Sequence, residues 1–536
     1  MTTLIKQIII LIFAFSIFSF AGYSQTNKTP DPNKTSKKLA ATMQIIRYAY
    51  VDSINEADLV ENAIIETLKE LDPHSSYISK EDIEAANEPL EGSFEGIGVT
   101  FQIYHDTILV VAPVPGGPSD KLGIRAGDKI IIIDGENSTG EKINNKFVFD
   151  HLRGKKGTEV IVSIFRKGKK ELIEYTIERD KIPLNSIDAT FMATPEIGFI
   201  KLNRFSKTSM DEFKKSLSKL KKQGMEKLIL DLRGNSGGYL NTAIKLSDEF
   251  LPGGKLIVYT EGLRSSTQKF NSTSFGGFKN GELVVMINEG SASASEIVSG
   301  AIQDWDRGVV LGRRSFGKGL VQRPFQLPDG SVIRLTTARY HTPTGRCIQR
   351  PYENGVQEYY LDLYKRFNNG ELENRDSIHF PDSLKYTTPK NRIVFGGGGI
   401  MPDVFVPWDS TTITDYYTDI VRKRILNDFV MNYMDENRKK LSKKYSELDN
   451  FKNQFHIDDK FMTNFVEFAK EKGIEANKDD YKKSEQFLAK QIKALIARNL
   501  WDSSAYFEII YEIDDEFIKS IEILQDDSLY KKITNN

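Results

Sequence analysis

The 536-residue sequence contains a single cysteine, Cys347, and an almost equal number of basic and acidic residues. One cysteine cannot form an intramolecular disulfide, and Cys347 stands in no spacing typical of a metal site, so we expect neither a metal centre nor a cofactor. With 73 basic and 74 acidic residues, the net charge is −1. Such a balance offers nothing that would steer the protein toward nucleic acid.

Long apolar runs are also missing after the first two dozen residues. Lys6 precedes an uncharged stretch at 8–21, whose length suits the core of a signal peptide better than a membrane span. We therefore expect residues 1–24 to be a signal peptide cleaved after Ser24, and the protein to be exported to the periplasm or cell envelope. If the signal is not cleaved, it would associate the protein with a membrane. A polar linker is expected at 25–36.

A serine-rich segment at 288–296 joins two regular elements. Residues 282–287 are typical of a buried strand, and residues 295–304 predict a helix with an acidic first turn. Ser293 would then lie at a strand-to-helix turn, where free N–H groups favour a developing negative charge. Taken alone, the segment is more simply a Ser- and Ala-rich helix cap without catalytic function.

Lys318 follows in a short glycine-rich segment and supplies a second chemical group. Serine needs a neighbouring group to remove its proton, and lysine can do so only where burial favours the neutral amine. Gln322 would lie on the same side of the chain as Lys318 in either a strand or a helix. Ser293 and Lys318 together therefore predict a serine nucleophile with a lysine base.

A second glycine-rich loop, at 234–238, follows a predicted buried strand that begins at Leu228 and precedes a helical stretch at 239–250. Glycine permits positive φ angles and close approach of the backbone, which is how a main-chain N–H is presented to an oxyanion. Ser291 and Ser295 remain alternative nucleophiles on chemistry alone.

These segments resemble the C-terminal processing peptidases, also called tail-specific serine proteases. The resemblance extends over about residues 37–407, and its motifs occur in the family's order: Leu71–Ile78, Asp231–Gly238, Gly290–Glu296, Gly317–Gly319, Tyr340–Arg346 and Gly399–Asp403. It implies that Ser293 is the nucleophile, that Lys318 is the general base and that Gln322 positions the lysine.

The same resemblance implies an oxyanion hole built from main-chain amides. These would be the amide of Ala294 and the amide of Gly237 or Gly238. On this interpretation the protein is a serine endopeptidase that recognises C-terminal tails of envelope proteins and cleaves them by acyl transfer. A catalytically silent peptide-binding protein with a PDZ domain, on the same fold, is the alternative.

Two other catalytic interpretations are weaker. Residues 312–319 nearly match a phosphate-binding loop, but Gly319 stands where a Ser or Thr should hold magnesium. A serine–histidine pair would need His341 or His74, and each of these is more simply structural.

Residues 92–180 resemble a PDZ domain. Gly96, Ile97, Gly98 and Val99 precede an alternating strand, and the later glycine and charged positions occur in the expected order. Such a domain offers backbone N–H groups to the terminal carboxylate of a peptide, which adds to the sheet edge as a strand. Because Ile97 and Val99 are apolar, the expected partners are protein substrates with free, apolar C-termini.

The expected fold is an α/β multidomain architecture with a ClpP/crotonase-like serine protease core at 184–410 and the PDZ domain inserted at 92–180. An N-terminal helical region at 37–91 either packs on the core or forms a homo-oligomer. A helical extension is expected at 411–536. A polar insertion at 351–396 and the extension both depart from the family pattern.

Two apolar stripes in the extension have helical spacing: Phe461, Phe465 and Phe468, and Leu488, Ile492 and Leu495. Each stripe is either a buried helix face or an assembly surface.

Overall fold

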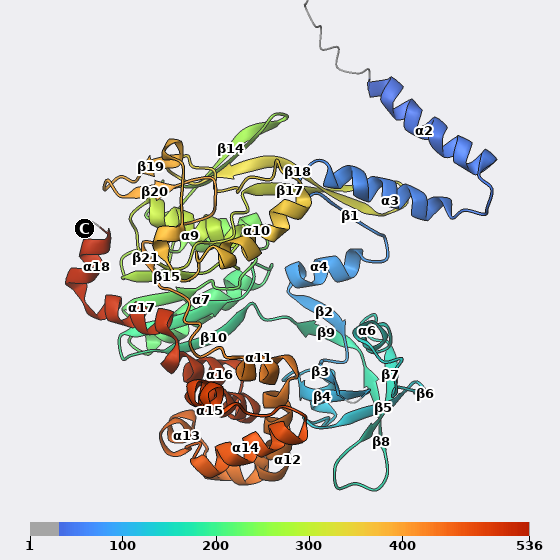
Figure 1. Ribbon diagram of the computed structural model, residues 1–536, viewed down its shortest axis with the longest axis vertical. Helices are drawn as coiled ribbons and strands as arrows, with labels where there is room; N and C mark the ends of the chain where they lie inside the picture. Colours follow the sequence, from blue (N-terminus) through green and yellow to red (C-terminus); the bar gives the residue numbers. More distant parts are fainter. Residues whose placement is uncertain (1–31, 105, 535–536) are drawn as a thin grey trace, which may run out of the picture. The chain divides into compact units, whose positions relative to one another are not determined.

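A computed structural model describes residues 32–104 and 106–534, in a chain that forms two compact units at 1–67 and 68–536 (Figure 1). The predicted signal peptide lies outside the described residues. Within the described ranges, no helix combines the length and the apolar character that crossing a membrane requires.

The first unit is helical where it is described. It contains α2 (Pro32–Ala49) and all but the end of α3 (Glu56–Lys69). Helix α2 begins at Pro32, inside the range predicted as linker. Leu39, Ile45 and Tyr48 of α2 are exposed in the single chain.

The PDZ module of the second unit is built around one antiparallel sheet in the order β3-β4-β5-β7-β8 (Figure 1). Strand β3 is at the edge of this sheet, and helix α6 packs beside it through an edge contact between the rings of Phe101 and Phe149. The elements are β2 (Ser93–Gly96), β3 (Val99–Tyr104), β4 (Thr107–Pro113), α5 (Pro118–Lys121), β5 (Lys129–Ile133), β6 (Glu136–Asn137), α6 (Asn145–Leu152), β7 (Glu159–Phe165), β8 (Ile173–Glu178) and β9 (Asp180–Pro183).

The protease core is an α/β structure, as expected, with a six-stranded sheet in the order β10-β11-β12-β15-β16-β21. Only β10 is antiparallel to its neighbour. The strands are β10 (Ile187–Met192), β11 (Ile197–Leu202), β12 (Lys227–Asp231), β15 (Leu283–Ile287), β16 (Val309–Gly312) and β21 (Val404–Phe405).

Both faces of this sheet are covered. Because successive side chains of a strand point to opposite faces, each strand contributes to two separate hydrophobic cores. Leu230 and Val285 belong to a core with helices α7 (Ser209–Lys222), α8 (Leu240–Asp248) and α9 (Ala294–Asp304). Ile229 and Met286 belong to a second core, which includes side chains from α17 (Asp515–Gln525) and α18 (Asp527–Thr534). The end of the described chain thus completes the hydrophobic core of the protease sheet.

A second sheet has the order β1-β18-β13-β14, with β17 paired to β18. Its strands are β1 (Ser76–Ile78), β13 (Leu256–Gly262), β14 (Ser265–Asn271), β17 (Leu320–Gln326) and β18 (Val332–His341). The predicted insertion is ordered and contains α10 (Val356–Asn368), β19 (Lys385–Thr387) and β20 (Ile393–Phe395).

The rest of the C-terminal extension has a hydrophobic core of its own. Phe465, Leu488 and Ile492 are fully buried in it, which confirms that both stripes are buried helix faces. The helices are α11 (Asp415–Arg422), α12 (Ile425–Lys444), α13 (Leu448–Gln454), α14 (Asp459–Glu471), α15 (Lys478–Leu500) and α16 (Ser503–Ile510).

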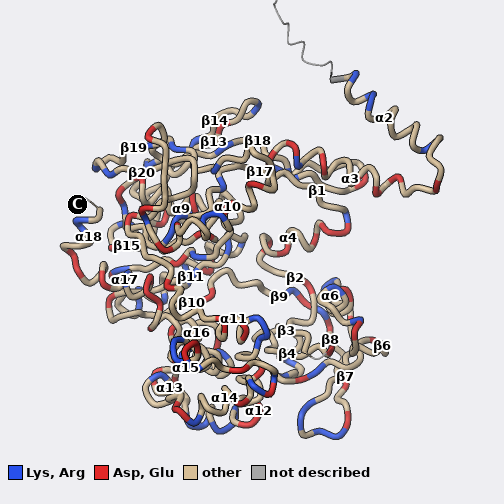
Figure 2. Tube along the Cα trace, viewed as in Figure 1, with Lys and Arg blue, Asp and Glu red and all other residues tan. Residues whose placement is uncertain are grey.

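Basic and acidic residues alternate along most of the described chain (Figure 2). One concentration of positive charge lies at 166–170, at the tip of the hairpin between β7 and β8. The mixture agrees with the near-neutral net charge of the sequence.

Candidate functional site

A cleft of about 1190 Å³ opens beside the carboxyl ends of the parallel strands. Helix α4 (Ile83–Glu91) and the second sheet contribute to its walls. All six residues that the sequence predicts for catalysis and oxyanion binding line this cleft: Ser293, Lys318, Gln322, Ala294, Gly237 and Gly238.

Ser293 joins the end of the β15 loop to the start of helix α9. Its backbone has φ 54° and ψ −110°, a region that non-glycine residues rarely occupy and that costs about 1–3 kcal/mol. Gly237 packs directly against it, since a Cβ atom on Gly237 would lie 2.9 Å from the Ser293 Cβ. The surrounding structure therefore holds the serine in an unfavourable conformation, and glycine is needed beside it.

Glu296 joins the backbones of the two predicted catalytic residues. Its carboxylate accepts hydrogen bonds from the N–H groups of Ser293 at 2.8 Å and Lys318 at 2.9 Å. It also accepts from the N–H of Gly317 and the hydroxyl of Ser315. Glu296 is fully buried, and burial raises its pKa to about 7 against the effect of these hydrogen bonds.

Tyr340 connects the same two residues through their carbonyl groups. Its buried hydroxyl lies within hydrogen-bonding distance of the Ser293 carbonyl, at 3.1 Å, and of the Lys318 carbonyl. A phenol has one hydrogen and donates to one carbonyl at a time. Tyr340 and Glu296 therefore fix the separation of the serine and lysine backbones.

Neither Glu296 nor Tyr340 was expected to be a site residue from the sequence. A signal was present for Glu296, because a glutamate three residues after a serine at a helix start is a capping-box pattern. No local pattern shows that this carboxylate also binds the Lys318 segment.

The environment of Lys318 favours the neutral amine. Burial lowers the pKa of Lys318 below its ordinary value, although the negative charges of Glu296 and Asp72 oppose the shift. This is the direction that a lysine base requires.

Gln322 lies on β17 and is held by two contacts. Its side-chain N–H groups donate to the Leu320 carbonyl and to the Thr336 hydroxyl, each at 3.2 Å. The Thr336 hydroxyl donates in turn to Asp72 at 3.0 Å. Among the described residues no hydrogen bond links Gln322 to Lys318, so its predicted positioning effect would have to come through proximity in the cleft.

The two candidate oxyanion glycines differ in their contacts. The Gly237 N–H donates to the side-chain oxygen of Asn235 at 2.9 Å. Within the described part of the chain the Gly238 N–H has no hydrogen-bond acceptor, and Gly238 is exposed. Ala294 is the first residue of α9, so its N–H has no intrahelical partner.

The alternative nucleophiles are occupied elsewhere. Ser291 and Ser295 are fully buried, and their hydroxyls donate to the carbonyls of Leu232 and Asn235, both at 2.8 Å. Of the three serines, Ser293 is the one that lines the cleft.

The two alternative histidine bases contact groups outside the cleft. His74 contacts the Tyr359 hydroxyl at 2.9 Å, and burial lowers the pKa of His74 to about 3. His341 stacks on the ring of Tyr259 and contacts the Gly345 carbonyl at 3.1 Å. Neither lines the cleft. Across residues 32–104 and 106–534, no group of three or more His, Cys, Asp and Glu side chains could hold a metal ion.

The predicted peptide-binding loop of the PDZ module lies next to the edge strand β3. The carbonyls of Ile97 and Gly98 accept hydrogen bonds from the N–H groups of Ser119 and Val114. Ile97 is buried in the module's core, so Phe101 and Phe149 provide the apolar surface beside β3.

Comparison with known families matches residues 196–358 to peptidase family S41 and residues 96–177 to the PDZ domain. Residues 416–502 match a family of unknown function.

Individual proteins are also similar to this chain. A probable CtpA-like serine protease of Staphylococcus aureus is 34% identical over 349 residues, which cover 65% of this chain and 68% of the relative. A carboxy-terminal-processing protease of Bartonella bacilliformis is 33% identical, with 63% of this chain and 80% of the relative covered. Among solved structures, a photosystem II D1 C-terminal processing protease is 28% identical, with 58% and 83% coverage and a TM-score of 0.35.

Proposed function

Because the chain belongs to peptidase family S41, among the C-terminal processing serine proteases, we propose that it is an exported endopeptidase with a serine–lysine mechanism. One observation supports this proposal above the others. Ser293 and Lys318 line the same cleft. Glu296 accepts hydrogen bonds from the N–H groups of both residues, and the Tyr340 hydroxyl lies within hydrogen-bonding distance of both carbonyls.

In the acylation step, neutral Lys318 removes the proton from the Ser293 hydroxyl, whose oxygen attacks the carbonyl carbon of the scissile peptide bond. The resulting oxyanion accepts hydrogen bonds from the N–H groups of Ala294 and Gly238. Gly238 is preferred because the N–H of Gly237 is already bonded to Asn235.

Collapse of the tetrahedral intermediate breaks the carbon–nitrogen bond. Protonated Lys318 gives its proton to the departing amine, and the acyl group stays on Ser293 as an ester. Water then attacks the ester while Lys318 accepts its proton, and the same amides stabilise the second oxyanion. When the second intermediate collapses, the bond between the acyl carbon and the Ser293 oxygen breaks, and Lys318 gives the proton to that oxygen, which restores the serine hydroxyl and the neutral lysine.

Substrates are selected by their C-terminal tails. The tail adds to the free edge of β3, and the amides of Gly96–Val99 bind its carboxylate. Phe101 and Phe149 give apolar contact for the last side chains, which favours proteins ending in apolar residues. Envelope proteins are the proposed substrates because residues 1–24 have the pattern of a signal peptide.

The mechanism is tested with purified protein and a substrate that carries an apolar tail, in the absence of ATP. Turnover should resist chelators and thiol reagents, and a serine-directed phosphonylating agent should label Ser293. Mass spectrometry of the labelled peptide distinguishes Ser293 from Ser291 and Ser295. Loss of activity in chelator that a divalent ion restores would refute the mechanism.

Export is tested separately. We expect the protein to be recovered from the cell-envelope fraction with an N-terminus just after Ser24. A cytoplasmic protein that retains residue 1 would contradict this part of the proposal.

A further inference from the structure

Three loops leave the carboxyl ends of neighbouring parallel strands β12, β15 and β16, and each leads to one part of the proposed active site. The β12 loop continues to Gly238, the β15 loop to Ser293 and the β16 loop to Lys318. The relative positions of these loops therefore determine whether nucleophile, base and oxyanion donors come together.

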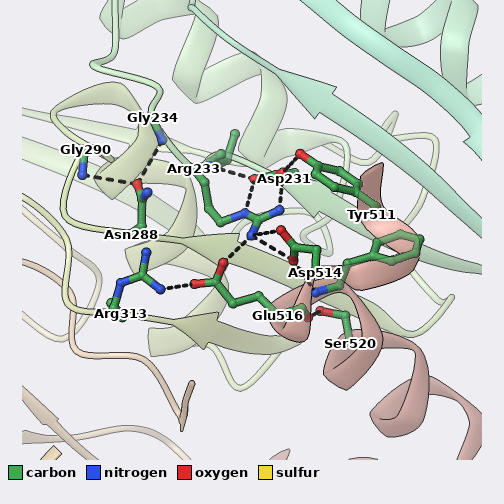
Figure 3. Close-up of polar contacts among 12 residues, drawn as sticks. Asp231, Arg233, Gly234, Asn288, Gly290, Arg313, Tyr511, Asp514, Glu516 and Ser520 are labelled. Carbon is green, nitrogen blue, oxygen red and sulfur yellow. Dashed lines mark hydrogen bonds and ion pairs between the residues drawn. The ribbon is translucent and has the colours of Figure 1, made fainter. Parts of the chain in front are cut away.

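One polar network connects residues near the start of all three loops (Figure 3). Arg233 leaves β12 and donates to both side-chain oxygens of Asp514, at 3.0 and 2.9 Å, and to Glu516. Arg313 leaves β16 and donates to the other oxygen of Glu516 at 2.7 Å. Glu516 thus bridges the β12 and β16 loops.

The β15 loop is bonded to both the β12 loop and the β16 loop. The side-chain oxygen of Asn288 accepts from the N–H of Gly234 at 2.8 Å and of Gly290 at 3.1 Å (Figure 3). Glu289 accepts from the Arg313 side chain at 3.0 Å. The β15 loop is therefore bonded to its neighbours on either side.

Asp514 and Glu516 come from the C-terminal extension, at the start of helix α17. The helix is anchored to the protease sheet by the buried side chains of Phe517, Ile523 and Leu524. Tyr511, just before it, donates its hydroxyl to the fully buried Asp231 at 2.7 Å. Burial raises the pKa of Asp231, but the charges of Arg233 and Lys201 outweigh this effect and lower it.

We propose that Asp514 and Glu516 are positioning residues of the protease, which hold the three active-site loops in register through Arg233 and Arg313. This inference rests on the proposed roles of Ser293 and Lys318. It assigns a catalytic consequence to the end of the C-terminal extension. The ion pairs are largely buried, so removing one partner leaves a charged group without compensation beside the loops.

The test uses the full chain with Asp514→Asn, Glu516→Gln and the double variant. Asp515→Asn is the matched control, because Asp515 lies in the same helical turn but is exposed. Asparagine can keep the N-cap bond of Asp514 to the Phe517 N–H, which preserves α17. Turnover of a tailed substrate gives kcat and KM, and hydrogen exchange reports opening of peptides covering 232–238, 288–293 and 313–318.

We expect the double variant to lose at least about 10-fold in kcat, with KM within about 3-fold, and to exchange faster in the three loops. The Asp515→Asn control should match the wild type. If Glu516→Gln does not fold, Asp514→Asn alone carries the test, since Asp514 is the more exposed of the two.

Unchanged kcat in the folded variants would overturn the inference, whether or not exchange increases. A proportional loss of kcat and of global stability, without faster exchange in the loops, would also overturn it. If the proposed function fails instead, Ser293→Ala will retain full activity. Hydrogen exchange of the Asp514 and Glu516 variants will still show whether these residues hold the three loops.

Discussion

Two glycine-rich loops in this protein are proposed to bind oxygen anions, and they are built in opposite ways. The loop at 234–238 is fixed at several points, because Gly234 and Gly237 donate to the side chains of Asn288 and Asn235. The loop at 96–99 precedes β3, which is an edge strand in the part of the sheet that the structure describes. A transition state needs donors at fixed positions, whereas a peptide tail needs an edge that accepts a new strand.

The difference predicts that substitutions in the active-site cleft, which contains the loop at 234–238, change kcat. Changes to the tail that binds beside β3 of the PDZ module should change KM instead.

The largest expected effect is on the catalytic pair, Ser293 and Lys318. Ser293→Ala and Lys318→Arg should each lower kcat by at least about 1000-fold, because arginine does not become neutral and cannot accept the serine proton. Binding of an isolated tail peptide, followed by fluorescence anisotropy, should be unchanged.

A Lys318→Arg variant with near-normal kcat would mean that the lysine is structural. Thermal unfolding serves as the control for folding in both variants. Since burial lowers the pKa of Lys318, wild-type kcat should rise with pH along a curve whose midpoint lies below the ordinary lysine value of 10.5.

The second prediction concerns the contribution of Glu296 to the free energy of unfolding. Glu296 has a folded-state pKa of about 7, above its ordinary value of 4.5, so the folded protein binds this proton more tightly than the unfolded chain. Its contribution is therefore complete below about pH 4.5, and the free energy of unfolding falls by about 3 kcal/mol as pH rises to about 7. Glu296→Gln should lack this decrease.

Urea unfolding across this pH range, in an otherwise inactive Ser293→Ala background, measures the decrease without self-digestion. Glu174→Gln, at an exposed position of β8, is the matched control and should retain the wild-type curve. Identical curves for Glu296→Gln and the control would show that Glu296 is not the titrating group.

The third prediction tests whether the PDZ module binds the C-terminus of a substrate beside β3. Amidating the C-terminus of a substrate, or ending it with Asp-Asp, should raise KM about 10-fold and leave kcat nearly unchanged. Amidation removes the carboxylate that the loop binds, and a charged end would be buried without a partner. Equal KM values for the free-acid, amidated and Asp-tailed substrates would remove the PDZ module from substrate selection.

The smallest expected effect is at Gln322. Gln322→Ala should lower kcat only about 5-fold, because its bonds are to Leu320 and Thr336 and it affects Lys318 indirectly. Gln326→Ala, exposed on the same strand, is the control and should be normal. A loss as large as that of Lys318→Arg would make Gln322 part of the proton transfer.

The α/β core was expected because predicted strands alternate with predicted helices, and the PDZ module was expected from its resemblance to that domain. The sequence also selected six residues that the structure brings to one cleft. The family resemblance implied those roles, and the fold agrees with it because Ser293 and the glycines lie on loops that follow neighbouring strands of the sheet.

What the sequence did not predict depends on contacts between distant segments. Glu296 reads as a helix cap, and only the fold shows that it also binds the backbone at 317–318. The apolar spacing of Phe517, Ile523 and Leu524 would suit packing within the extension equally well. A pattern of buried residues shows that a helix is covered, and it does not identify the element that covers it.

Arg233 and Asp514 are separated by 281 positions along the chain. At the usual rate of about 5–20 residues per second, the ribosome adds the second residue some tens of seconds after the first. In the later part of that interval the growing polypeptide contains Ser293 and Lys318, but it lacks the helix that covers the second face of their sheet and pairs with Arg233. The apolar second face of the protease sheet therefore stays uncovered until the extension has been made, although the serine and the lysine are already present.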